Sequence, residues 1–193
     1  MTTPAARLAR TFHPSRLPFR LVVLLVVSLL AFGPYFATDV ISAIETFLIR
    51  DLGLNREAIG MMFTLYSVAA IPAVFAAGLV IDRIGVSRAG LLFAMLVALG
   101  TLLIAAMPKL PTMYAGRLLL GGGCEPLLVA QNVMLARWFA GRELALSFGV
   151  TLTFSRLGSL FAYNSGALLA GRYGFRRALW VAAAICFVSL LAA

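Results

Sequence analysis

Charged and hydrophilic residues are scarce in this chain. Only 12% of its 193 residues are charged and 62% are hydrophobic, whereas ordinary soluble domains are roughly 25% charged and roughly 45–50% apolar. Histidine and cysteine are nearly absent, with His13 near the amino terminus and Cys124 and Cys186 inside apolar runs. We therefore expect no disulfide framework, no metal centre and no cofactor.

Groupings typical of enzymes and of nucleic-acid-binding proteins are also missing. No serine or cysteine has a candidate base nearby in the sequence, so we do not expect an enzyme, although this argument leaves Ser/Lys and Asp-only sites open. The formal net charge is +9. Because the arginines are scattered between apolar runs, without a basic face or stacking aromatics, we expect them to set membrane topology and not to bind nucleic acid.

What the sequence has is a series of apolar runs. About 20 residues in a helix cross a hydrocarbon core of about 30 Å. We predict an all-α, polytopic membrane protein with a basic cytoplasmic tail over residues 1–17 and a transmembrane bundle over 18–193. The six predicted spans cover residues 18–48, 57–81, 89–108, 112–139, 142–171 and 176–193.

The sixth predicted span is short. Residues 178–193 give a helix of about 24 Å at about 1.5 Å per residue, and the sequence ends in Leu190, Leu191, Ala192 and Ala193 without a polar flank. We therefore expect a carboxy-terminal half to follow Ala193 in the natural protein.

A polar hairpin separates the second and third predicted spans. The segment from Gly78 to Arg88, with Asp82, Arg83 and Gly85 inside it, resembles the signature hairpin of the major facilitator superfamily. The resemblance implies that the hairpin is cytoplasmic, that the amino terminus is cytoplasmic as well, and that the chain is the amino-terminal, six-helix half of a transporter.

Other segments narrow this resemblance. Arg117 and Gly121, early in the fourth span, resemble a second motif of the superfamily. Across residues 32–159, the combined first, fourth and fifth spans resemble a lysosomal dipeptide-transporting branch and its bacterial relatives, including the stretches around Glu125 and Arg156. This resemblance implies alternating-access transport of a small molecule, and we expect a bacterial inner (plasma) membrane location.

Two opposite charges lie near the centres of predicted spans. Glu125 and Arg156 would each cost roughly 2.5–3.5 kcal/mol there, so each needs a partner or a polar cavity. At about 100° per residue, polar side chains recur on one face of spans one, four and five. The candidate substrate-binding residues are Tyr35, Asp39, Glu125, Asn132, Arg156, Ser159 and Tyr163.

Opposed charges across one cavity suit a zwitterion, and the resemblance makes this a dipeptide. We expect Arg156 to bind its carboxylate, and Glu125 or Asp39 to bind its amino group. Three alternatives remain open. Glu125 and Arg156 could form a purely structural ion pair, the cargo could be an organic anion or drug with proton coupling at Glu125, or the chain could be a non-transporting scaffold, which would not need polar stripes.

The hairpin is predicted to act as a gate. Its glycines permit a tight turn and close backbone approach, and its charges could pair with those at the cytoplasmic ends of spans four and five. The alternative is a solvated loop that only sets topology, because isolated surface ion pairs contribute little. The gating candidates are Gly78, Asp82, Arg83, Gly85, Arg88, Arg137 and Glu143.

Overall fold

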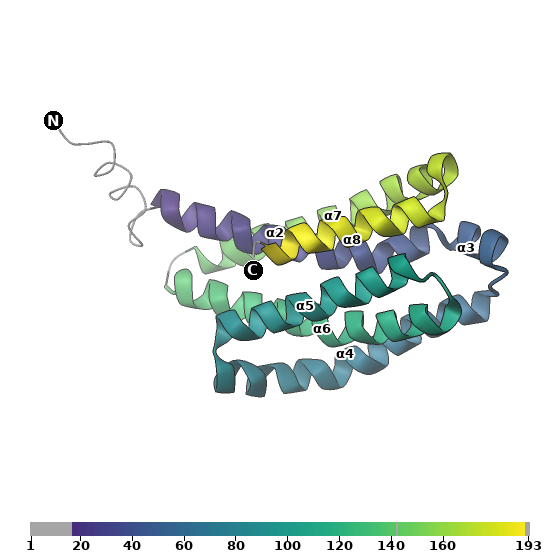
Figure 1. The fold of residues 1–193 in the computed structure, drawn as a ribbon. Helices are drawn as coiled ribbons and strands as arrows, with labels where there is room; N and C mark the ends of the chain where they lie inside the picture. Colours follow the sequence, from purple (N-terminus) through teal and green to yellow (C-terminus); the bar gives the residue numbers. More distant parts are fainter. Residues whose placement is uncertain (1–16, 142, 192–193) are drawn as a thin grey trace.

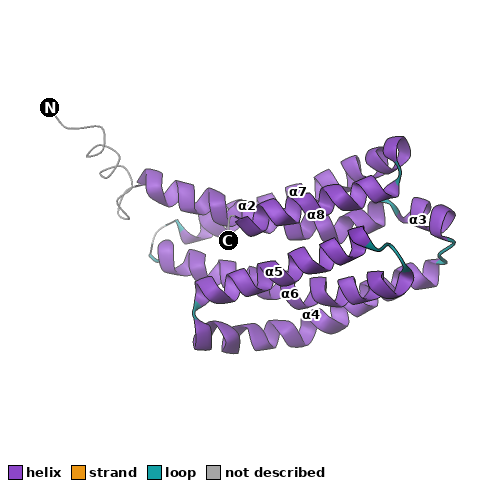
Figure 2. Cartoon of the chain, in the orientation of Figure 1, coloured by secondary structure: helices purple, strands orange, loops and turns teal. Residues whose placement is uncertain are grey.

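The computed structural model describes residues 17–141 and 143–191, and its regular structure over these residues is entirely helical (Figure 2). The predicted basic tail lies outside the described residues, apart from Leu17. The helices are α2 (Leu17–Ala43), α3 (Glu45–Leu52), α4 (Arg56–Ile84), α5 (Val86–Ala106), α6 (Leu110–Trp138), α7 (Leu144–Tyr173) and α8 (Phe175–Leu191).

The long helices form one bundle, with α2, α7 and α8 on one side and α4, α5 and α6 on the other (Figure 1). Within the described residues, α2, α4, α5, α6 and α7 are long and apolar enough to cross a membrane. Helix α8 has 17 described residues, slightly fewer than the ~20 of a full crossing. The all-α membrane bundle predicted from the sequence is confirmed, and each predicted span has its helix.

The structure differs from the predicted first span, 18–48. Helix α2 ends at Ala43, and a separate helix, α3, begins at Glu45. Helix α3 also contains Arg50 and Asp51, whose side chains form an exposed ion pair with an N–O distance of 2.6 Å. Because charged side chains are costly in hydrocarbon, the apolar crossing stops where these charges begin.

The hairpin between α4 and α5 is shorter than predicted. Asp82 and Arg83 belong to the last turn of α4, Arg88 belongs to the first turn of α5, and only Gly85 separates the two helices. Gly85 has a φ of 85°, a conformation that favours glycine. The predicted tight turn is therefore present, and it is made by a single residue.

Close approach of helices builds the core of the bundle. The most extensive contacts join α5 to α6, α2 to α7, and α4 to α6. A Cβ atom at Gly121 of α6 would overlap the backbone carbonyl of Tyr66 on α4, and one at Gly158 of α7 would lie 2.5 Å from the carbonyl oxygen of Phe32 on α2. Small residues at such crossings let membrane helices pack backbone against backbone.

We predict that Gly121→Ala separates α4 from α6, because its Cβ cannot be accommodated without moving the α4 backbone. The expected loss of stability is about 1–3 kcal/mol, as for other overpacked sites, measured by thermal unfolding of the purified protein. Gly122→Ala is the matched control, since a Cβ there meets no atom within 4 Å. An equal loss in both variants would contradict the assigned helix contact.

Candidate functional site

A small polar cavity lies where α2, α4, α6 and α7 meet. Its volume is about 180 Å³. The cavity brings together Tyr35 and Asp39 of α2, Glu125 of α6 and Arg156 of α7, all predicted as substrate-binding residues. Its lining residues are Pro34, Tyr35, Thr38, Asp39, Tyr66, Cys124, Glu125 and Arg156. We call it the charged cavity.

Glu125 is held in the charged cavity by a neighbouring helix. The hydroxyl of Tyr66 on α4 donates a hydrogen bond to Glu125 Oε1 at 2.9 Å. Sequence reasoning missed Tyr66, because α4 shows no polar stripe comparable to those of the other cavity helices. The only signal was a single tyrosine in an apolar span, and aromatic residues with one polar tip are also common packing residues.

Arg156 is the free positive charge of the charged cavity. Its guanidinium carbon lies 6.0 Å from the centre of the Tyr35 ring, at the edge of the roughly 6 Å range of cation–π contacts. Among the described residues, neither Arg156 nor Glu125 takes part in an ion pair. The structural pair weighed as an alternative is thus not formed in this structure, although both charges line one cavity.

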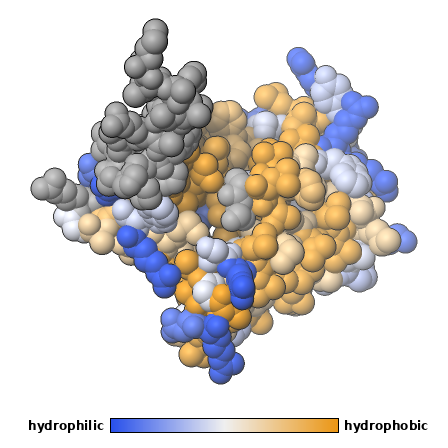
Figure 3. Space-filling model, turned by 60° about the vertical axis from the view of Figure 1, so that its left-hand side comes forward, coloured by the Kyte–Doolittle hydropathy of each residue, from blue (hydrophilic) through white to orange (hydrophobic). Residues whose placement is uncertain are grey.

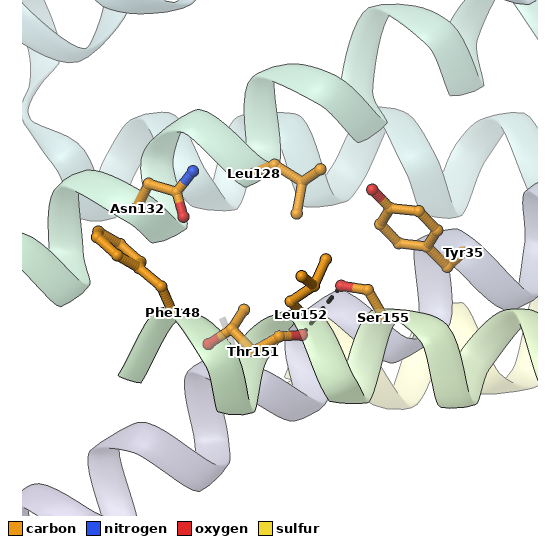
Figure 4. A pocket seen from close by; sticks show the side chains of 7 residues that line it. All are labelled: Tyr35, Leu128, Asn132, Phe148, Thr151, Leu152 and Ser155. Carbon is orange, nitrogen blue, oxygen red and sulfur yellow. Dashed lines mark hydrogen bonds between the residues drawn. The ribbon is translucent and has the colours of Figure 1, made fainter. Parts of the chain in front are cut away.

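A second cavity of about 330 Å³ adjoins the charged cavity at Tyr35, which lines both (Figure 4). In Figure 4, Leu128 and Asn132 of α6 lie opposite Phe148 and Leu152 of α7. The complete lining is Tyr35, Leu128, Asn132, Phe148, Thr151, Leu152 and Ser155. Its position on the same helix face as Glu125 had placed Asn132 at the same site. Asn132 instead lines this largely apolar cavity and does not line the charged cavity.

Two predicted substrate-binding residues line neither cavity. Ser159 is partly buried, and the Tyr163 side chain is 51% exposed on the surface of α7. Both follow Arg156 at helical spacing, but Arg156 is the only one of the three that lines the charged cavity. Sharing a helix face was therefore not enough to place them at the site.

The helix-four motif connects helices behind the charged cavity. Arg117 is fully buried, its Nη2 donates to the Thr38 carbonyl oxygen at 3.1 Å, and its guanidinium carbon lies 4.7 Å from the centre of the Phe63 ring. Thr38 lines the charged cavity, whereas Arg117 does not. Arg117 and the close contact at Gly121 thus fix α6 against α2 and α4.

The predicted gating cluster is not assembled. Asp82, Arg83 and Arg88 are exposed, and no ion pair of the described residues joins them to Arg137 or Glu143.

Two gating candidates also have surroundings other than those expected. Glu143 instead lies 3.7 Å from Arg20 of α2, measured from Oε2 to Nη2. The close approach expected at Gly78 is absent too, since a Cβ there would meet no described atom within 4 Å.

Hydrophobic side chains cover most of the side of the bundle seen in Figure 3, while hydrophilic ones gather toward its ends. Together with the apolar helices, this surface defines a multi-pass integral membrane protein with a charged cavity inside it. Residues 5–193 match the family model of the Major Facilitator Superfamily. The chain belongs to that superfamily.

Individual relatives are similar over most of the chain. The lysosomal dipeptide transporter MFSD1 of Danio rerio is 31% identical over 98% of the chain, and that of Homo sapiens is 36% identical over 78%. The chain spans 44% and 33% of the lengths of these two relatives. The solved structure of PepTSo, a POT family transporter, shares the fold with a TM-score of 0.78 and 17% identity over 92% of the chain and 37% of PepTSo.

We predict that Tyr66→Phe weakens the contact between α4 and α6. The expected loss of stability is about 1.5 kcal/mol, at the lower end for a hydrogen bond to a charged group, because Glu125 is only partly buried. Thermal unfolding would measure it. Tyr114→Phe is the control, since the Tyr114 hydroxyl has no hydrogen bond to another described residue. Unchanged stability of Tyr66→Phe would show that the bond contributes nothing.

Proposed function

We propose that the chain forms the amino-terminal, six-helix half of a secondary transporter that moves small zwitterions, such as dipeptides, by alternating access. One observation carries this proposal. Two carboxylates, Asp39 and Glu125, share a cavity with Arg156, and Arg156 is paired with neither of them. A substrate with an amino group and a carboxylate would satisfy both signs of charge at once.

The names of the relatives support the substrate class. MFSD1 is named as a lysosomal dipeptide transporter, and in a dipeptide one amino group and one carboxylate are separated by a short backbone. On this proposal, Arg156 binds the carboxylate through its planar fork of donors, and Glu125 or Asp39 binds the amino group. The side chains of the dipeptide then have the adjoining cavity at Tyr35 available.

The small volume of the charged cavity supports the idea that residues outside this chain complete the binding site. A volume of about 180 Å³ is below the roughly 300–1,000 Å³ of most ligand pockets. Helices α4 and α7 are also the least buried of the candidate spans. We propose that a second half of the protein packs against them and closes the cavity.

For topology, we propose that the α4–α5 turn and the amino terminus are cytoplasmic and that the membrane is a bacterial inner membrane. The cytoplasmic assignment is supported by the likeness of the segment around Asp82 and Gly85 to the superfamily hairpin. The bacterial assignment rests on the resemblance to bacterial members of the branch.

Proton coupling is the second candidate property of the site. The charged cavity holds two carboxylates and one guanidinium, so a carboxylate is left without a positive partner when Arg156 binds a substrate anion: both of them if the cargo has no amine, and one if an amino group of the cargo pairs with the other. That carboxylate could carry a proton, and an organic anion or drug would then be moved with proton coupling at Glu125. We also propose that the chain has no enzymatic activity.

We predict that Arg156→Gln and Glu125→Gln impair different cargoes. Loss of the guanidinium should most affect a cargo with a free carboxylate, and loss of the Glu125 charge should most affect one with a free amine. The measurement is uptake of a dipeptide, its amidated form and its acetylated form into proteoliposomes containing the complete protein. Arg172→Gln, an exposed change at the far end of α7, is the control and should leave all three rates unchanged.

The double variant separates a substrate site from a structural pair. If both charges bind substrate, combining Glu125→Gln with Arg156→Gln should not restore uptake, although melting temperatures show a folded protein. If the two charges only stabilise one another in another conformation, the double variant should regain activity. Full uptake by the double variant, or equal sensitivity of both single variants to all three cargoes, would refute the assignment.

We predict that Asp82→Asn slows transport without weakening substrate binding. Asp82 lies 16 residues beyond Tyr66 on α4, about 24 Å along the helix, which is too far for contact with a substrate at Glu125. Substrate-induced thermal stabilisation should therefore persist while the uptake rate falls. Glu57→Gln, in the first turn of α4, is the control. Lost stabilisation with an unchanged rate per bound substrate would contradict a gating role.

A further inference from the structure

An apolar groove runs between α5 and α8, away from both cavities described above. Its volume is about 560 Å³, and it shares no residue with the charged cavity or with the cavity of Figure 4. The lining residues are Met95, Ala98, Leu99, Leu102, Trp180, Ala183, Ala184, Phe187 and Leu190. Apart from the indole N–H of Trp180, these side chains offer no hydrogen-bond donor and no charge.

The length of the groove matches one leaflet of a bilayer. From Trp180 to Leu190 the α8 wall is about 15 Å long at about 1.5 Å per residue. A hydrocarbon core of about 30 Å gives each leaflet about 15 Å. The groove therefore has the extent of a single acyl chain that stays within one leaflet.

One end of the groove is basic. Arg176 precedes Trp180 by four residues on α8, so both side chains lie on the same helix face. Lys109 follows Leu102 by seven residues, just beyond the carboxy-terminal end of α5. Both basic side chains are exposed, and neither forms an ion pair with a residue that the structure describes. The carboxy-terminal end of α5 and the amino-terminal end of α8 lie at the same end of the bundle, near α3 (Figure 1). Lys109 and Arg176 are at these two helix ends.

We propose that the α5–α8 groove binds one acyl chain of an anionic phospholipid in the leaflet at the α3 end, with Arg176 and Lys109 contacting the phosphate headgroup. Trp180 lines the groove at its basic end, and tryptophan is enriched at membrane interfaces. Charge complementarity selects an anionic headgroup over a zwitterionic one. The site is separate from the charged cavity, so the proposal does not depend on the identity of the cargo.

The test measures lipid retention by the complete protein. Purified protein is mixed with equal amounts of phosphatidylglycerol and phosphatidylcholine of identical acyl chains, and retained lipids are counted by native mass spectrometry. The wild type should retain phosphatidylglycerol preferentially. Arg176→Gln should reduce that preference about fivefold, since a basic residue near anionic lipid contributes about that factor. Leu102→Trp should fill the groove and reduce retention of both lipids.

Matched variants control for general effects. Leu91→Trp changes a leucine of the same helix with nearly the same exposure, 43% against 44% for Leu102, outside the groove. Arg56→Gln removes an exposed charge at the same end of the bundle, on α4. Both should retain lipid as the wild type does. If Leu102→Trp does not fold, as judged by its melting temperature, Ala184→Leu replaces it, because Ala184 is exposed in the groove.

Four results would overturn the proposal. One is equal retention of both lipids by the wild type. Another is a loss of lipid as large in Leu91→Trp or Arg56→Gln as in the groove variants. The third is stabilisation by inorganic phosphate alone as strong as that by phosphatidylglycerol, which would show an anion site without an acyl chain. Crosslinking of a partner helix into the groove, with lipid retention unchanged by Leu102→Trp, would likewise replace lipid with protein as its occupant.

Discussion

The cost of ionised side chains in an apolar bundle is the constraint on which the arrangement of this structure depends. Each such charge costs roughly 2.5–3.5 kcal/mol at a helix centre, and three of them are offset differently. Glu125 accepts a hydrogen bond from Tyr66. Arg117 binds a backbone carbonyl and lies over an aromatic ring. Arg156 remains open to the cavity. Two of these charges therefore fasten helices together, and one is left available.

Close helix packing and the polar contact at Glu125 depend on each other. Gly121 and Glu125 are one turn apart on α6, and both meet the same residue of α4. The backbone carbonyl of Tyr66 lies against Gly121, while its hydroxyl reaches Glu125. Because Gly121 has no side chain, α6 comes near enough to α4 for one tyrosine to make both contacts. A larger residue at Gly121 would move the donor away from the carboxylate.

The sequence predicted the spans and the charges of the cavity, because apolar length and helical periodicity are local properties. Tyr35, Asp39, Glu125 and Arg156 were placed together on that basis, and they share a cavity. Periodicity does not say how each helix is rotated against its neighbours. It could not find Tyr66, whose partner is 59 positions away, and for the same reason it assigned the exposed Tyr163 to the site.

Glu125 and Arg156 have different surroundings. In the proposed transporter, this difference would affect how closure of the cavity is linked to substrate binding. A carboxylate such as Glu125 can be neutralised by a proton, whereas an arginine keeps its charge in proteins. Arg156 has no ion-pair partner among the described residues. Closing the cavity and removing its water would leave this guanidinium without a counter-charge unless an anion entered with it or a cavity carboxylate moved to pair with it. On the proposed function, the substrate carboxylate supplies that counter-charge, so bound cargo would favour closure.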